Sequence, residues 1–243
     1  MRDEDTVIRL GDVGSTNDEA MAHLRAGEGP FWLTAERQLA GRGRRGRAWV
    51  SEAGNLYATF AFSGHFAPEA FGILPLGAAV ALADALCANG FDPALKWPND
   101  VLIDGKKCAG ILIETSVQGR SASRSTVIGY GVNVAHHPPD APATHLAAHR
   151  THVTKDGIFA ALRPAVAAVL AVLQDTVGPR NIRQRWLQRA VGLGEPVTVR
   201  YDRGTAHGRF LGLDPEGRLI LEEEGGATRL VAAGDVFVRT EPL

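Results

Sequence analysis

The segment Val101–Ile113 reads VLIDGKKCAGILI, in which two apolar runs flank the pair Asp104-Gly105. Asp-Gly is a favoured two-residue hairpin turn, because both turn positions need a positive φ and these residues tolerate it. Other runs rich in β-branched and aromatic residues predict strands over 31–35, 56–62, 95–97 and 127–134. Strand-rich and helix-rich stretches are mixed without a strict βαβ alternation. The sequence therefore predicts an α+β fold with a largely antiparallel, mixed sheet and flanking helices.

The first helix is expected to begin at Ser15 or Thr16 and to stop at Gly27. Either residue can cap a helix, and Thr16-x-x-Glu19 matches a capping box. Further helices are expected over 157–174 and 181–189. Two apolar segments, 71–88 and 158–173, are each interrupted by proline and a charged residue, so both are expected to be core helices rather than membrane spans.

The composition is that of an ordinary globular chain, with 243 residues of which 45% are hydrophobic and 22% charged. The formal net charge is −1, so affinity for a nucleotide or a nucleic acid must come from a local basic cluster. Cys87 and Cys108 are too few for a disulfide framework, and the acidic amino terminus lacks the apolar stretch of a secretory signal. These features favour a cytoplasmic location.

The sequence changes character near Gly192. Short predicted strands follow from Pro196 onward, separated by turn residues such as those of Asp214-Pro215-Glu216-Gly217. This pattern predicts a small SH3-like β-barrel. We therefore expect a large domain over 1–192 and a carboxy-terminal barrel over 193–243.

A basic loop lies between two of the predicted strands. Residues 38–49 read QLAGRGRRGRAW, with four arginines and three glycines between Gly41 and Arg47. Glycine lets the backbone approach a ligand closely, and arginine offers a fork of donors to carboxylate or phosphate. We expect the loop to be poorly ordered until an anion binds. Composition alone leaves open a solvated basic loop or a nucleic-acid contact.

Two further motifs place polar groups beside predicted strands. In the first, Lys96-Trp97-Pro98-Asn99-Asp100, the proline ends a strand and leaves Asn99 and Asp100 at a turn, where they can meet a ligand or a metal ion. Lys107 follows just after the hairpin turn, and Gly110 permits close approach on the next strand. An ordinary hairpin with exposed lysines is the alternative. In the second motif, GYGVNV over 129–134, the polar Asn133 lies among apolar neighbours and needs partners.

Five of the eight histidines fall in one predicted loop, at His136, His137, His145, His149 and His152. A metal site is one interpretation. No cysteine or paired carboxylate joins these residues, so a solvated loop is the favoured one.

In order and spacing these motifs resemble those of the biotin protein ligases. The resemblance spans roughly residues 10–240 and is carried by Ser15-Thr16-Asn17, Gln38-x-Ala40-Gly41-Arg42-Gly43-Arg44-Arg45-Gly46-Arg47, Lys96-Trp97-Pro98-Asn99-Asp100, Lys107-x-Ala109-Gly110 and Gly129-x-Gly131-x-Asn133. It implies a catalytic domain of the class II aminoacyl-tRNA synthetase-like type over 1–192, followed by the small barrel.

The resemblance also implies an activity and its partners. Biotin and ATP would form biotinyl-5′-AMP with the help of Mg²⁺, and biotin would then pass to a lysine of the carrier protein or domain of a biotin-dependent carboxylase. It leaves a homodimer open. Only about a dozen residues precede Gly14, too few for a helix-turn-helix domain, so we expect a monofunctional ligase that binds neither DNA nor membranes.

The resemblance assigns roles to individual residues. The catalytic residues would be Lys107, Arg42 and Arg44. Biotin would be held by Ser15, Thr16, Asn17, Gln38, Arg42, Gly43, Arg44, Lys107 and Gly110. ATP would be bound by Arg44, Arg47, Trp49, Lys96, Asn99, Asp100, Asn133 and Arg239, with Asp100 as the ligand of Mg²⁺.

Two alternatives remain at this point. A lipoate–protein ligase shares the fold type and the adenylation chemistry, but the Arg-Arg-x-x-Gly-Gly-Gly pattern of that family is missing from this sequence. A nucleic-acid-binding module using the basic loop and the barrel would belong to a different class, and it predicts a steep salt dependence of binding.

Overall fold

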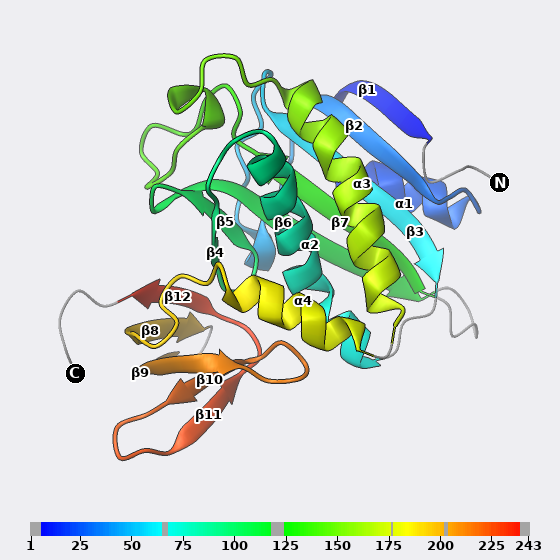
Figure 1. Cartoon of the computed structure of the whole chain (residues 1–243). Helices are drawn as coiled ribbons and strands as arrows, with labels where there is room; N and C mark the ends of the chain where they lie inside the picture. The colour runs from blue at the N-terminus through cyan, green and yellow to red at the C-terminus, as the bar shows by residue number, and fades with distance from the viewer. Residues whose placement is uncertain (1–5, 65–67, 118–123, 176, 202–203, 239–243) are drawn as a thin grey trace. The chain divides into compact units, whose positions relative to one another are not determined.

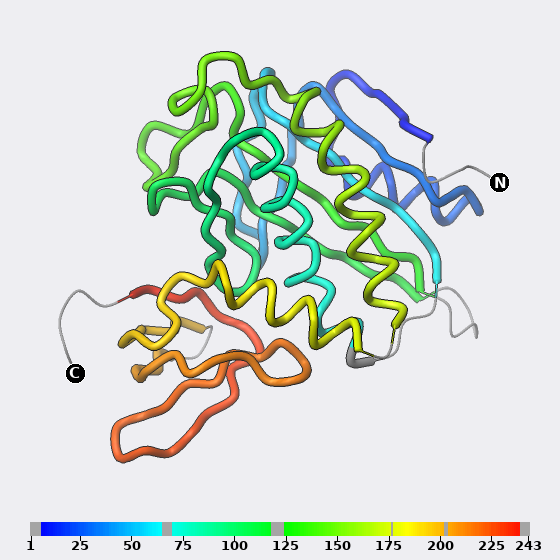
Figure 2. Tube along the Cα trace, viewed as in Figure 1, coloured from blue at the N-terminus to red at the C-terminus, as the bar shows by residue number. Residues whose placement is uncertain are grey.

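The computed structural model describes residues 6–64, 68–117, 124–175, 177–201 and 204–238 (Figure 1). The chain divides into two compact units, whose paths can be followed in Figure 2. Unit 1 comprises Met1–His65 and Lys106–Ala161, and unit 2 comprises Phe66–Gly105 and Leu162–Leu243. We describe each unit by itself.

Unit 1 is built on five adjacent strands in the order β1-β2-β3-β7-β6. Their bounds are β1 Val7–Val13, β2 Phe31–Gln38, β3 Leu56–Gly64, β6 Lys106–Val117 and β7 Arg124–Val132. Strand β1 pairs with β2 in parallel, and the remaining pairs are antiparallel. The mixed, largely antiparallel sheet that the sequence predicts is therefore confirmed.

Helix α1, Thr16–Arg25, packs on one face of these strands. Its apolar side chains join those of three strands in a buried cluster of Ala20, Met21, Leu24, Phe31, Leu33, Ala61 and Val127. The opposite face carries Trp32, whose ring lies 5.1 Å from that of Phe60 and 5.3 Å from that of Phe159, in the first turns of α3, Lys155–Leu173. Side chains alternate between the two faces of a sheet along a strand, so Leu33 packs toward α1 and the adjacent Trp32 packs toward Phe159 of α3.

The predicted capping box at the start of α1 is wrong. The cap residue is Ser15, and its side chain makes no capping hydrogen bond. Thr16 is already inside the helix, and its hydroxyl lies 3.0 Å from Gln38 Oε1 and 2.9 Å from Thr59 Oγ1. The Thr16 hydroxyl, which the sequence predicts as a cap, instead contacts side chains of the strands β2 and β3.

Unit 2 contains α2, Pro68–Ala88, the strands β4, Ala94–Lys96, and β5, Asp100–Ile103, the rest of α3, and α4, Gly178–Leu187. Asp104 and Gly105 follow β5 with φ of 48° and 72°, which confirms the predicted hairpin turn. Helices α2 and α3 are long and apolar enough to cross a membrane. Most of α2 is buried inside the fold, as expected for a core helix.

The carboxy-terminal part of unit 2 is a small antiparallel sheet in the order β11-β10-β9-β8-β12. Its strands are β8 Pro196–Tyr201, β9 Gly204–Leu213, β10 Leu219–Glu222, β11 Thr228–Val231 and β12 Asp235–Val238. They fall where the sequence predicts strands, and the alternating burial of Val197, Val199 and Leu221 gives the sheet its own core.

Candidate active site

Glycines form a hollow in the face of the unit 1 sheet that α1 covers. Gly129, Gly131 and Gly110 lie on the adjacent strands β7 and β6, with Gly110 directly opposite Gly131. A Cβ at Gly131 would lie 2.6 Å from Trp49 Nε1, and one at Gly129 would lie 2.3 Å from Asn17 Oδ1. Only glycine leaves room for these two side chains, so the Gly-x-Gly-x-Asn motif shapes the floor of a site.

Trp49 stands at the end of the arginine loop and lies over this floor. Its ring atom Cζ3 is 3.1 Å from the Cβ position of Gly110, and Lys107 Nζ lies 5.3 Å from its ring centre. The Trp49 Nε1 atom is buried and has no hydrogen-bond partner among the described residues. A buried indole N–H normally finds an acceptor, so this side chain marks the hollow as a place for a polar ligand.

The arginine loop is pinned at its two ends. Trp49 N donates to Gly41 O at 2.9 Å, and Gly43 N donates to Arg47 O at 2.7 Å. Between them Arg44–Gly46 form a short 3-10 turn, in which Arg45 has a φ of 57°. The expected disorder of the empty loop stays a prediction, but its backbone has a defined internal pattern of hydrogen bonds.

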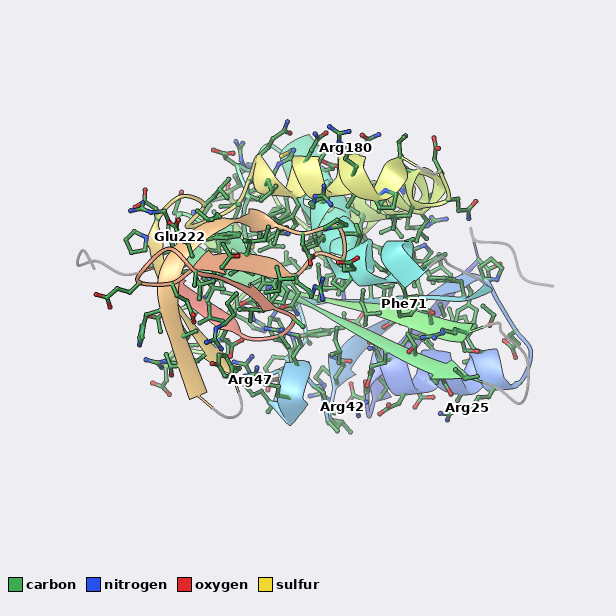
Figure 3. The ribbon with its side chains drawn as sticks, turned by 90° about the horizontal axis from the view of Figure 1, so that it is seen from below. Arg25, Arg42, Arg47, Phe71, Arg180 and Glu222 are labelled. Atoms are coloured by element: carbon green, nitrogen blue, oxygen red, sulfur yellow. The ribbon has the colours of Figure 1, made fainter. Side chains whose placement is uncertain are left out.

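Arg42 is bound to acidic side chains within unit 1. Its two terminal nitrogens donate to the Asp18 carboxylate at 2.7 and 2.6 Å, and one of them lies 3.4 Å from Glu114 Oε1. These hydrogen bonds hold the pKa of the Asp18 carboxyl below its ordinary value and raise the pKa of the Arg42 guanidinium. Figure 3 shows Arg42 on the side of unit 1 that carries α1. The first arginine of the loop thus ties it to the helix.

A hydrogen-bond chain links α1 to the strands β2 and β3 and to the end of the arginine loop. Thr16 N donates to Gln38 Oε1 at 2.9 Å, and Gln38 Nε2 donates to Ser51 Oγ at 3.1 Å. Ser51 Oγ in turn donates to the backbone carbonyl of Trp49 at 2.9 Å. In the other direction, Thr59 Oγ1 lies 2.9 Å from Thr16 Oγ1. The predicted residues Thr16 and Gln38 are therefore brought together beside the loop.

The amide of Asn17 is fully engaged by protein groups. Its Nδ2 donates to Leu112 O at 3.3 Å and to Glu114 Oε2 at 2.8 Å, and its Oδ1 accepts from Thr59 Oγ1 at 2.8 Å. Thr59 and Glu114 are functional candidates that the sequence motifs missed. Their only sequence signal is a polar side chain within an otherwise apolar strand.

Asn133 and Lys107 are connected to the histidine-rich loop. Asn133 Nδ2 donates to Thr144 O at 3.1 Å, and Thr144 N donates to Lys107 O at 2.9 Å. The Asn133 side chain, predicted on the ATP side, is buried and fixes the backbone of this loop. The sequence predicts that Asn133 needs a partner, and that partner is a backbone carbonyl, that of Thr144.

The histidine loop carries no group of three or more metal-ligating side chains in the described part of the chain. His137 Nδ1 and His145 Nδ1 lie 2.8 Å apart, and Thr144 Oγ1 lies 2.8 Å from His149 Nε2. Burial and the nearby histidines, His137 first, lower the pKa of His145. These contacts lie within the loop, and Thr144 N, which donates to Lys107 O, joins the loop to the backbone that carries Lys107.

Three predicted residues lie in unit 2. Lys96 Nζ is 4.8 Å from the centre of the Phe237 ring, which Arg200 also approaches, at 4.7 Å. Asn99 is buried and Asp100 is half-buried, on either side of the point where β5 begins. The strand β4 is anchored nearby, because Trp97 Nε1 donates to Gly217 O at 3.0 Å. Arg239 lies outside the described residues.

Comparison with known proteins gives the family. A family model described as biotin/lipoate A/B protein ligase family matches residues 12–133, and one described as biotin protein ligase C terminal domain matches residues 192–239. A biotin–acetyl-CoA-carboxylase ligase of Paracoccus denitrificans is 40% identical over 239 residues, which are 94% of this chain and 98% of that protein. This chain belongs to the biotin protein ligase family.

Other members of the biotin protein ligase family agree with this assignment. The bifunctional ligase/repressor BirA of Bacillus subtilis is 34% identical over 224 residues, which cover 88% of this chain and 67% of BirA. A biotin protein ligase from Aquifex aeolicus, solved in complex with biotin and ATP, superposes with a TM-score of 0.78 at 26% identity, covering 97% and 99% of the two chains. The predicted family and fold class are confirmed.

Proposed function

We propose that this biotin protein ligase catalyses an adenylyl transfer followed by an acyl transfer. In the first, a carboxylate oxygen of biotin attacks the α-phosphorus of ATP, the bond from that phosphorus to the bridging oxygen breaks, and pyrophosphate leaves. In the second, a lysine amine of a carboxylase carrier domain attacks the acyl carbon of biotinyl-5′-AMP. AMP leaves with the electrons of the broken carbon–oxygen bond, and the amine loses its proton.

The observation that carries the proposal is the meeting of Lys107 and Trp49 over the glycine floor. Lys107 Nζ lies 3.5 Å from the Cβ position of Gly110 and 5.3 Å from the Trp49 ring. A flat, backbone-lined surface with an aromatic ring and an adjacent cation suits an apolar acid whose carboxylate must be neutralised. It also suits a planar base next to a phosphate.

Charge neutralisation is the main chemical task in the first step. Two like unit charges about 4 Å apart repel by about 4 kcal/mol at an effective dielectric constant of about 20, and a triphosphate carries several. Lys107 and Arg44 would lie between the carboxylate and the α-phosphate and favour the transition state, where negative charge concentrates. Lys107 is half-buried, which strengthens such an interaction relative to bulk water.

Arg42 is proposed to act differently from Arg44. Its guanidinium is already paired with Asp18, and its remaining neighbour is the carboxylate of Glu114. We therefore assign Arg42 to holding the start of the loop against α1. Arg47, whose Nε lies 3.5 Å from Arg44 O, would stabilise the turn from the other end.

Biotin's ureido ring is proposed to bind at the amino end of α1. Ser15, Thr16 and Gln38 would contact the ring. The amide atoms of Asn17 are bound to Thr59, Glu114 and Leu112, so Asn17 would support the site without contacting biotin through its amide. Trp49 would cover the ring system or the adenine. Its buried Nε1, which has no acceptor within the described residues, fits a ligand oxygen or nitrogen.

Mg²⁺ is proposed to enter with ATP. The described residues contain no group of three acidic, histidine or cysteine ligands, which fits an ion that keeps several waters and binds through one carboxylate and the phosphates. Asp100, with Asn99 beside it, would supply that carboxylate. When bound, the ion would neutralise phosphate charge and orient the leaving pyrophosphate.

A biotin-transfer assay tests the function directly. Purified protein with ATP, Mg²⁺, biotin and a biotin carrier domain is expected to release pyrophosphate and to label one carrier lysine. Lipoate in place of biotin is the matched control, and it is expected to give neither product. Pyrophosphate release with lipoate but not with biotin would contradict the proposal. The proposed cellular setting is the cytoplasm, with a carboxylase carrier as partner and without a DNA-binding role.

A further inference from the structure

The carboxylate of Glu114, in β6, contacts both the amino end of α1 and the arginine loop. Its Oε2 accepts from Asn17 Nδ2 at 2.8 Å, and its Oε1 lies 3.4 Å from Arg42 Nη2. Asn17 is buried, whereas the side chains of Arg42 and Glu114 are 35% and 37% exposed. The two oxygens of one side chain therefore contact two different parts of the site, one buried and one half-buried.

The register of the sheet explains the position of Glu114. Leu112 lies opposite Gly129 in β7, and Glu114 lies opposite Val127. A Cβ at Gly129 would meet the amide of Asn17, and Val127 joins the buried cluster beneath α1. Side chains directly opposite each other in a sheet share a face, so Glu114 lies on the face that α1 covers, next to the glycine floor.

The space between Asn17 and Arg42 suits a group with an acceptor at each end. Asn17 Nδ2 donates to the Leu112 carbonyl as well as to Glu114, and a guanidinium has donors only. A carboxylate offers one acceptor oxygen to each partner. A glutamine amide in the same place has one acceptor and one donor, so two donors would face each other at one of the two contacts.

Asp18 binds the same guanidinium from the helix. Its carboxylate accepts from the two terminal nitrogens of Arg42 at 2.7 and 2.6 Å, and its side chain is 57% exposed. An exposed ion pair of this kind contributes little by itself. Glu114 adds an acceptor from the strand, in a less exposed position. Arg42 is therefore held between a carboxylate of α1 and a carboxylate of β6.

We propose that Glu114 is a positioning residue that keeps the arginine loop in place beside the biotin site, by binding Arg42 and Asn17 with one carboxylate. The inference rests on the proposed function, and in it Glu114 acts through these two side chains rather than on a substrate. A loop tied to both the helix and the sheet retains a bound ligand longer. The contribution of Glu114 is therefore expected in the dissociation rates of biotin and biotinyl-5′-AMP.

Glu114→Gln tests this role with almost no change of shape. The glutamine oxygen is expected to accept from Asn17, across the shorter contact, which leaves its NH₂ group facing Arg42. We expect the dissociation rate of biotin, measured by chasing labelled biotin with unlabelled biotin, to rise about threefold to tenfold. Escaped adenylate should raise the labelling of bystander proteins relative to the carrier. Pyrophosphate release at saturating biotin and ATP should change by less than about twofold.

A double-mutant cycle identifies the partner through which Glu114 acts. Glu114→Gln should raise the dissociation rate in the wild-type background and have no further effect in Arg42→Ala. Glu36→Gln is the matched control, because the Glu36 carboxylate also binds a cation of unit 1, Lys155 Nζ, at 2.7 and 2.6 Å. This control is expected to keep the wild-type dissociation rate.

A wild-type dissociation rate in Glu114→Gln would overturn the inference. So would a faster rate that Glu114→Gln also produces in the Arg42→Ala background, or an equal increase in Glu36→Gln. Should Glu114→Gln fail to fold, Glu114→Asp makes the same comparison, because its shorter side chain keeps the charge and cannot span both partners. Failure of the wild type to bind biotin would instead contradict the proposed function.

Discussion

The ε-amino nitrogen of Lys107 lies 5.3 Å from the centre of the Trp49 ring. Lys107 is at the start of β6, and Trp49 ends the arginine loop, so two segments distant in sequence meet over Gly110. Thr144 binds the backbone carbonyl of Lys107 at 2.9 Å and fixes the base of the side chain. This geometry makes Lys107 the residue on which the first chemical step is expected to depend.

Lys107→Ala is expected to lower the rate of biotin-dependent pyrophosphate release by roughly 10²–10³, because one charge contact in the transition state is worth about 2–4 kcal/mol. The melting temperature should barely move, since the side chain is half-buried and fills no core position. Lys106→Ala is the matched control, because Lys106 is an exposed lysine next to Lys107. A variant at position 107 with near-normal pyrophosphate release would refute the catalytic assignment.

Gly131→Ala is expected to displace the Trp49 indole, because the new Cβ would lie 2.6 Å from Nε1 and 2.7 Å from Cε2. Overpacking of this kind costs about 1–3 kcal/mol, and the site should lose affinity for biotin and ATP as well. Thermal melts and biotin calorimetry measure the two effects. Gly64→Ala provides the control, since no atom of the described residues lies within 4 Å of its Cβ position. Equal behaviour of the two variants would show that the indole does not depend on the glycine floor.

The sequence predicts the strands and turns that carry this site better than it predicts the side-chain contacts within the site. Hydrophobic runs and the Asp104-Gly105 turn identify most strands, because strand and turn preferences are local. Strand β1 is missed, since its VIRLGDV pattern combines a glycine with exposed and half-buried positions and lacks clear alternation. The roles of Thr59 and Glu114 could not be predicted, because Asn17 meets them across 42 and 97 residues of sequence. Contacts of that kind follow from sheet register, which no local motif encodes.

The same limit applies to Arg42. The spacing of the arginine loop predicts a binding element, and it gives no sign that the first arginine pairs with Asp18 of α1. That pairing depends on where the helix crosses the sheet, and the crossing is set by the apolar side chains of Ala20, Met21 and Leu24 beneath it. Core packing thus decides that the first arginine of the motif meets Asp18.

The free energy of unfolding is expected to increase with pH below 6.5 because of His145. Burial lowers the pKa of His145 below 6.5, so the folded protein binds fewer protons than the unfolded chain between the folded-state pKa and 6.5. Stability should therefore rise with pH in this window and fall as His145 is protonated. Urea denaturation between about pH 5.5 and 7.5 measures the slope. His145→Asn should flatten it, and His152→Asn, which changes an exposed histidine of the same loop, should leave it unchanged.

Arg44→Ala is expected to release the reactive intermediate. A mixed anhydride hydrolyses readily and acylates any accessible amine, so a ligase must hold biotinyl-5′-AMP away from water until the carrier lysine arrives. Arg44 begins the 3-10 turn at the tip of the loop, and its backbone carbonyl accepts from Arg47 N at 3.3 Å. Alanine keeps that carbonyl and removes only the guanidinium. The loop should still form, and the bound adenylate should dissociate faster and label lysines of bystander proteins.

Bystander and carrier labelling measured side by side separate this effect from loss of chemistry. Lys107→Ala should lower both signals together, because it makes little adenylate that could escape. Arg45→Gly is the control for charge at the tip, since Arg45 has a φ of 57° that glycine adopts freely, and it should leave the ratio near that of the wild type. If Arg44→Ala loses activity with no rise in the ratio of bystander to carrier labelling, Arg44 neutralises charge in the transition state without retaining the adenylate, and the loop does not act as a cover.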